Sequence, residues 1–71
     1  MYAESFPSKL RKARKDTGFT QIEIEKELNI PRSTLANWEI GRTQPDIESL
    51  GILADFYEVS VDWLIGTKGG Q

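Results

Sequence analysis

Hydrophobic residues in the first part of the chain recur at the spacing of an amphipathic helix. Phe6, Leu10 and Ala13 lie three or four residues apart, and mainly polar and charged residues separate them. Gly18 follows this pattern, at a place where a glycine in the left-handed conformation commonly ends a helix. The pattern therefore predicts a helix over about residues 7–17.

Residues 20–39 contain two short helical patterns joined by a tight turn. Thr20 followed by Glu23 has the form of a capping box at a helix start. Asn29 tolerates the left-handed conformation that turns the chain, and Pro31 fits the start of the next helix. The apolar residues that such a helix-turn-helix must bury are Ile24, Leu28, Ile30, Leu35 and Trp38.

An alternative interpretation applies to the start of this segment. Residues 21–25 alternate between polar and apolar, as a half-buried strand does. Three polar residues at 25–27 interrupt the alternation, whereas a helix needs only Ile24 and Leu28, which lie four residues apart. We therefore favour a helix.

The second half of the chain predicts two further helices. Asp46 is the expected N-cap of a helix over about residues 47–57, and Ser60 caps a final short helix. Residues 67–71 have the composition of a disordered tail. Residues 1–66 are thus predicted to form one all-α domain of five helices joined by short loops.

The helix over residues 47–57 carries two apolar stripes. The first is the expected buried face, made of Ile47, Leu50, Leu53, Ala54 and Tyr57. The second consists of Ile52 and Phe56 on another side of the helix. This second stripe either widens the contact with the core or forms a dimer interface together with Trp63, and the sequence leaves both possibilities open.

The composition limits the chemistry available to the chain. Its 71 residues suffice for one small domain with a modest core. It contains no cysteine and no histidine, which excludes disulfides, thiolate zinc sites and the commonest general base. We expect no enzyme activity, no metal or other cofactor and no small-molecule ligand. Because a signal peptide and a long apolar run are absent, we expect a cytoplasmic protein that does not contact membranes.

Charge is unevenly distributed, although the formal net charge is only −2. Five of the nine basic residues lie between Lys9 and Lys15, and residues 43–67 contain acidic but no basic residues. A basic front and an acidic back suit a DNA-binding protein, because phosphate neutralisation supplies much of the affinity for DNA. A mixed solvated surface explains the same distribution equally well, so charge alone does not decide between them.

The second helix of the helix-turn-helix has one polar face. At about 100° per residue, Leu35 and Trp38 form a buried stripe. The opposite side presents a guanidinium, a hydroxyl, a methyl and an amide, from Arg32, Ser33, Ala36 and Asn37, with Thr34 at the border. Such groups read base edges in the major groove. The alternative, an ordinary solvated face, is disfavoured by the preceding helix, the tight turn and the basic loop that follows.

Arg14 and Glu39 lie at the margins of two facing apolar stripes. Arg14 is about 40° from Leu10 around the first helix, and Glu39 is about 40° from Leu35 around the third. Opposite charges at such positions suggest a partly buried ion pair. We therefore assign Arg14 to the structure of the domain rather than to DNA binding.

Together these features resemble the Cro/repressor-type helix-turn-helix domain, the lambda-repressor-like or XRE family. The resemblance covers about residues 8–66. Beyond residues 20–39 it rests on the segments LRKARKDTGFTQ, WEIGRTQPDIESL and LADFYEVSVDWLIG. It implies a compact five-helix bundle whose second and third helices form the helix-turn-helix. It also supports the pairing of Arg14 with Glu39.

The resemblance further implies roles for single residues. The expected base-reading residues are Arg32, Ser33, Thr34 and Asn37. The expected phosphate contacts are Thr20, Gln21, Arg42 and Thr43. Gln21 matches a glutamine that contacts phosphate in the family and braces the recognition helix. An exposed helix N-terminus also attracts anions through its free N–H groups and its dipole.

Glu25 departs from the family pattern, which prefers alanine where the second helix packs closely against the third. An unpaired buried carboxylate is costly. We therefore expect Glu25 to reach a donor such as Arg32, Thr34 or a free helix N–H, or to project outward. Asn29 replaces the usual glycine, but it tolerates the same backbone conformation.

The resemblance implies a sequence-specific, DNA-binding transcriptional regulator. We expect a repressor that binds a pseudo-palindromic, double-stranded operator as a homodimer, with the recognition helix in the major groove. Such a protein acts at the nucleoid of a prokaryotic or phage-type system. The alternative is a protein-interaction module, such as an antitoxin-like partner, with secondary or no DNA binding. The acidic charge balance and the stripe of Ile52 and Phe56 keep that alternative open.

Overall fold

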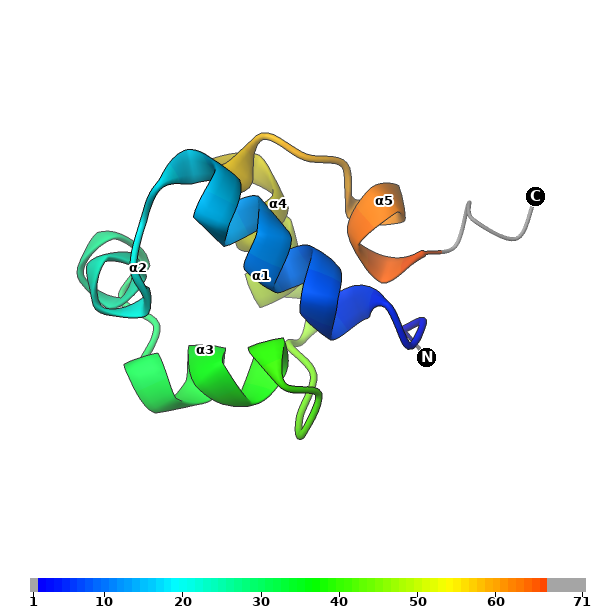
Figure 1. Cartoon of the computed structure of the whole chain (residues 1–71), viewed down its shortest axis with the longest axis horizontal. Helices are drawn as coiled ribbons and strands as arrows, with labels where there is room; N and C mark the ends of the chain where they lie inside the picture. The colour runs from blue at the N-terminus through cyan, green and yellow to red at the C-terminus, as the bar shows by residue number, and fades with distance from the viewer. Residues whose placement is uncertain (1, 67–71) are drawn as a thin grey trace.

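Five α-helices make up the part of the chain that the computed structural model describes, residues 2–66 (Figure 1). They are α1 (Phe6–Thr17), α2 (Gln21–Leu28), α3 (Arg32–Glu39), α4 (Ile47–Tyr57) and α5 (Val61–Ile65). The predicted all-α fold and its helix-turn-helix, α2 and α3, are confirmed. No helix within residues 2–66 is long and apolar enough to span a membrane. The tail predicted at residues 67–71 lies outside the described residues.

Side-chain caps start three of the helices at the predicted residues. The Thr20 hydroxyl accepts the Glu23 N–H at 3.1 Å, and the Glu23 carboxylate accepts the Thr20 N–H at 2.8 Å, which completes the capping box. Asp46 and Ser60 accept the N–H three residues further on, at 3.1 and 2.9 Å. Hydrogen bonds from the side chain and backbone of Ser49 hold the pKa of Asp46 below its ordinary value. These caps explain why α2, α4 and α5 begin where they do.

Residues in the left-handed conformation end four of the five helices, and Gly66, with φ of 78°, does so after α5. Gly18 follows α1 with φ of 87°, and Asn29 follows α2 with φ of 58°. Glu58 follows α4 with φ of 59°, and its N–H donates to carbonyls of the last turn. The sequence did not predict Glu58 in this role, because glutamate is uncommon in the left-handed region. The chain nonetheless turns there and leads directly into α5.

The core draws on every helix. Its central members are the most deeply buried large side chains, Phe6, Leu10, Ile24, Leu35, Leu50, Leu53 and Leu64. Five further buried residues complete it, namely Ala13, Ile30, Trp38, Ala54 and Tyr57. Of the residues predicted to be buried in the helix-turn-helix, Leu28 is only partly covered and packs at the edge of this cluster.

The first helix is the centre of the arrangement. α1 packs against α3, α4 and α5, while α2 packs against α3 (Figure 1). Two hydrogen bonds hold the segment before α1 against the rest of the domain. The Ala3 N–H donates to the Ile65 carbonyl in α5 at 3.0 Å, and the Tyr2 hydroxyl donates to the Pro45 carbonyl before α4 at 2.9 Å. The scaffold therefore holds α3 on one side of α1.

The prediction that Ile47 joins the buried face of α4 is wrong. Ile47 is 75% exposed, whereas Leu50 is fully buried. The two side chains are in phase around the helix, but Ile47 is the first residue of α4. It therefore lies one turn before the helix reaches the core.

Candidate nucleic-acid interface

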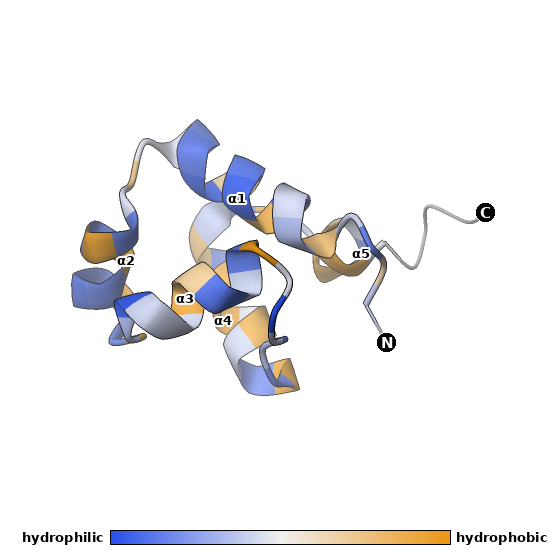
Figure 2. Cartoon of the chain, turned by 60° about the horizontal axis from the view of Figure 1, so that its bottom comes forward, coloured by the Kyte–Doolittle hydropathy of each residue, from blue (hydrophilic) through white to orange (hydrophobic). Residues whose placement is uncertain are grey.

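The third helix turns its apolar side to the core and its polar side outward (Figure 2). Leu35 and Trp38 are buried. The four predicted base-reading residues lie on the remaining surface, Arg32 and Ser33 exposed and Thr34 and Asn37 partly buried. The exposed pair stands at the first turn of α3, so its side chains can reach a ligand that meets the N-terminal end of the helix.

A hydrogen-bonded network fixes the other end of α3. Arg14 on α1 donates to both carboxylate oxygens of Glu39, from Nε at 2.8 Å and from Nη2 at 3.0 Å. Arg14 Nη1 also donates to the Phe19 carbonyl at 2.9 Å. Gln21, the first residue of α2, donates from Nε2 to Glu39 Oε1 at 3.0 Å. The network thus joins α1, α2 and α3 at one point.

Burial makes this ion pair structural. The side chains of Arg14 and Glu39 are only 10% and 2% exposed. The hydrogen bond that Arg14 donates to Glu39 raises the pKa of Arg14 above its already high ordinary value, and burial opposes this only in part. The pair is the one that the helix faces predicted. The hydrogen bonds and attraction within the pair offset the desolvation of its two charges, whereas a lone partner would be an uncompensated buried charge.

The loop after α3 begins with a sharp turn against α1. Gly41 has φ of 84°, and a Cβ at this position would lie 3.2 Å from Pro7 Cγ, so both conformation and space favour glycine. The Arg42 N–H donates to the Asn37 carbonyl at 3.0 Å. The turn therefore holds Arg42 and Thr43 beside the C-terminal end of α3, and both residues are exposed.

The start of α2 lies at this same end of α3. Thr20 is exposed and Gln21 is partly buried through its bond to Glu39. The first N–H groups of a helix have no partner within the helix, and here Thr20 satisfies that of Glu23. The four predicted phosphate contacts, Thr20, Gln21, Arg42 and Thr43, therefore all lie near the C-terminal end of α3.

Glu25 projects outward. It is exposed, so its carboxylate stays hydrated and the close packing of α2 on α3 is not disturbed. This is one of the two outcomes that its sequence position suggested. Among residues 2–66, no group of three or more acidic, histidine or cysteine side chains is arranged to hold a metal ion.

The apolar stripe of α4 is divided between core and surface. Phe56 packs on Phe19, with ring centroids 5.2 Å apart, and is only partly covered. Ile52 is 45% exposed. Trp63 packs partly on the core, and the Lys9 ammonium lies 5.3 Å from its ring centroid. The structure thus leaves Ile52 as the most open member of the predicted dimer surface.

Two contacts that brace the scaffold were missed by sequence reasoning. Lys9 donates to the Trp63 carbonyl at 3.0 Å, which links α1 to α5. The ring of Tyr2 lies 4.9 Å from that of Phe6, in addition to its bond to Pro45. Local sequence spacing predicts neither contact. Lys9 and Trp63 are brought together only by the tertiary fold, and Tyr2 lies outside a helix.

Comparison with known protein families identifies the architecture. The family model described as helix-turn-helix matches residues 10–64. The structure is similar to the DNA-binding domain of BldD from S. venezulae, with a TM-score of 0.77 and 29% identity, over 90% of this chain and 96% of that one. It is also similar to a transcriptional regulator from Listeria innocua, with a TM-score of 0.76 and 36% identity, over 86% of this chain and 57% of that one.

Curated relatives share the same region. The chain is 39% identical over 62 residues to the HTH-type transcriptional regulator ImmR of Bacillus subtilis (strain 168), covering 87% of this chain and 49% of that protein. It is 32% identical over 60 residues to the HTH-type transcriptional activator BcrR of Enterococcus faecalis, covering 84% of this chain and 29% of that protein. The chain therefore spans about half or less of the length of these two relatives.

Proposed function

This chain belongs to the helix-turn-helix family, and from that premise we propose that it is a sequence-specific, DNA-binding transcriptional regulator. The observation that carries the proposal is the orientation of α3 and its attachment to α1 and α2. Its outer face is polar, and hydrogen bonds from Arg14 and Gln21 to Glu39 join its C-terminal end to α1 and α2. Similarity to a DNA-binding domain and to HTH-type regulators supports the same function.

The proposed mechanism places the outer face of α3, from Arg32 to Asn37, in the major groove. Arg32 has the fork geometry that suits guanine O6 and N7, and Asn37 has the amide that suits adenine N6 and N7. Ser33 and Thr34 supply hydroxyl groups beside them. In helix-turn-helix proteins the N-terminal residues of the recognition helix contact base edges, which matches the exposure of Arg32 and Ser33.

The phosphate contacts would then set the position of α3 on the duplex. Thr20 and Gln21 offer the N-terminal end of α2, whose free N–H groups and dipole favour an anion. Arg42 and Thr43 offer a cation and a hydroxyl from the loop beyond α3. Such contacts orient a protein without reading sequence, so base preference is left to α3.

We further propose a homodimer that binds a pseudo-palindromic operator and acts as a repressor. Two copies related by two-fold symmetry would place two recognition helices in successive turns of the major groove. Ile52, which is 45% exposed, is the most open of the three residues predicted to form the dimer surface, the other two being Phe56 and Trp63. Repression needs only occupancy of the DNA, whereas activation needs an additional contact with the polymerase. The proposed site of action is the bacterial nucleoid in the cytoplasm.

The salt dependence of DNA binding tests this function against the alternative of a protein-interaction module. The protein is titrated with a pool of random duplexes and with the duplex it selects from that pool, at several salt concentrations. A DNA-binding regulator loses affinity steeply as salt rises, because phosphate contacts release counterions, and it prefers the selected duplex. Undetectable binding, or binding that is independent of salt and sequence, would favour the interaction module.

A further inference from the structure

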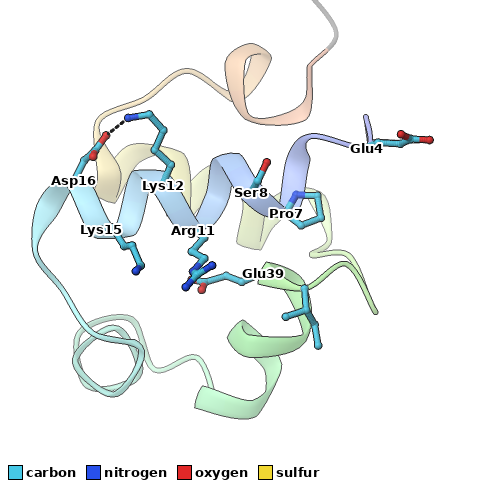
Figure 3. Close-up of a pocket in the computed structure, with 9 residues that line it drawn as sticks. Glu4, Pro7, Ser8, Arg11, Lys12, Lys15, Asp16 and Glu39 are labelled. Atoms are coloured by element: carbon cyan, nitrogen blue, oxygen red, sulfur yellow. Dashed lines mark hydrogen bonds and ion pairs between the residues drawn. The ribbon is translucent and has the colours of Figure 1, made fainter.

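An open groove runs between α1 and the C-terminal half of α3. Its walls and floor consist of Arg11, Arg14, Lys15, Gln21, Ala36, Glu39 and Ile40. A second hollow that continues along α1 shares Arg11, Lys15, Glu39 and Ile40. Figure 3 shows the side chains of Arg11 and Lys15 extending from α1 toward α3. None of the residues assigned to phosphate contact from the sequence lies on α1.

The groove carries uncompensated positive charge. Arg11 and Lys15 are both exposed, and neither forms an ion pair with any residue from 2 to 66. The Glu39 carboxylate at the floor is neutralised by Arg14 and also accepts a bond from Gln21. Two free cations therefore face a groove whose only carboxylate within the described chain is already paired.

Lys12, on the same helix, behaves differently. Its ammonium pairs with Asp16 at 2.9 Å, and the pair points away from α3 (Figure 3). Arg11 and Lys15 lie four residues apart, so they share the side of α1 that faces α3 and are separated by about 6 Å along the helix axis. The cationic side of α1 is thus directed at the groove rather than spread around the helix.

The opposite wall belongs to the exposed face of α3. Ala36 and Ile40 lie between Arg32 and Ser33 when α3 is viewed along its axis, at about 100° per residue. Ile40 is 66% exposed. The groove beside this face is lined by Gln21, the two cations and the apolar side chain of Ile40, so it is open to the sugar-phosphate backbone of a strand whose bases would meet α3.

We propose that this groove is a further DNA-backbone site, in which Arg11 and Lys15 bind phosphates of the strand that also contacts Gln21. The proposal rests on the proposed function, since the ligand is the same duplex. It explains how a chain of net charge −2 can hold DNA, because positive charge is gathered beside the recognition helix. Arg11 and Lys15 supply affinity, whereas α3 supplies base preference.

The test compares two double variants that each remove two positive charges. Arg11→Gln/Lys15→Gln removes the groove cations. Lys12→Gln/Lys26→Gln removes two exposed lysines outside the groove: Lys26 lines neither hollow, and Lys12 lines only the second, where it is paired with Asp16. The duplex selected by the wild type serves as the probe. We expect the groove variant to lower the slope of log affinity against log salt by about two, with the same base preference as the wild type. The control should keep a slope close to that of the wild type.

Neutral methylphosphonates, placed one at a time along the selected duplex, locate the contact. We expect a position where neutralisation weakens wild-type and control binding at least several-fold but leaves the groove variant unchanged. Equal loss in the groove and control variants, or no such position, would overturn the groove site while leaving the proposed function standing. A wild-type protein that binds no duplex would overturn both. Circular dichroism and thermal melting establish that the groove variant and the control variant are both folded.

Discussion

Arg14 on α1 and Glu39 at the last position of α3 are joined by two hydrogen bonds, from Nε to Oε2 at 2.8 Å and from Nη2 to Oε1 at 3.0 Å. The side chains are almost fully buried. The pair therefore fixes the C-terminal end of the recognition helix against the helix at the centre of the domain. Gln21 donates a third hydrogen bond to the same carboxylate and thereby joins the start of α2 to the end of α3.

Breaking this pair should destabilise the whole domain. We expect Arg14→Met to lower the free energy of unfolding by about 3–5 kcal/mol, because it leaves the Glu39 carboxylate buried without its partner. Urea denaturation measures the loss. Arg14→Met/Glu39→Met should recover a substantial part of it. A variant as stable as the wild type that no longer binds DNA would show instead that Arg14 acts on DNA.

Truncation of two residues of α4 should change the free energy of unfolding by very different amounts. Leu50→Ala is expected to lower the free energy of unfolding by about 2–5 kcal/mol, because a fully buried leucine leaves a cavity. Ile47→Ala should change it by less than about 0.5 kcal/mol, because Ile47 is 75% exposed. Thermal melting of both variants compares them directly. A large loss in Ile47→Ala would place Ile47 in the core after all.

Tyr57 should make the domain sensitive to alkali. Burial raises the pKa of Tyr57 above its ordinary value of 10.0, the charge of Glu39 adds to the rise and that of Arg14 opposes it. The unfolded chain ionises this phenol first, so the free energy of unfolding should fall as the pH rises above about 10. Urea denaturation of wild type and Tyr57→Phe, from pH 7 to pH 11, should show a smaller fall in the variant.

At neutral pH the same variant should be tolerated. The Tyr57 hydroxyl is buried and forms no hydrogen bond with residues 2–66. Removing a buried polar group without a partner costs little and can stabilise a protein, so Tyr57→Phe should be within about 1 kcal/mol of the wild type. If the free energy of unfolding falls equally in wild type and Tyr57→Phe between pH 7 and pH 11, Tyr57 is not the source of the alkaline sensitivity.

Ile52 should govern self-association. We expect Ile52→Glu to shift the monomer–dimer equilibrium toward monomer at high micromolar concentration, because the charge would be desolvated in an apolar interface. Its melting temperature as a monomer should change little, since Ile52 is 45% exposed. Sedimentation measures association, and Ile22→Glu on α2, where Ile22 is 50% exposed, is the matched control. A wild type that sediments strictly as a monomer would remove the proposed dimer surface.

Features that depend on helical geometry alone were predictable from the sequence. The capping box of Thr20 and Glu23 joins residues three apart, so their types and spacing suffice. Arg14 and Glu39 are far apart in sequence, but each lies beside the apolar stripe of its helix. Two packed helices bring such margins together, which is why the pair could be anticipated.

Features that depend on where the chain meets its neighbours were not predictable in this way. Ile47 is in phase with the buried stripe of α4, yet its position at the helix start takes it beyond the core. The contact of Lys9 with Trp63 joins helices at opposite ends of the chain. The groove between α1 and α3 likewise exists only in the folded domain, because the orientation of Arg11 and Lys15 toward α3 is a tertiary property.

The claim that α3 reads bases through Arg32 and Asn37 is tested by selecting preferred sites from random DNA. The wild type, Arg32→Ala and Asn37→Ala are compared under the same conditions. We expect each variant to lose preference at one base position in each half-site, guanine for Arg32 and adenine for Asn37, while the other positions keep theirs. Uniformly weaker binding with an unchanged preference would contradict the claim and reduce both residues to phosphate contacts.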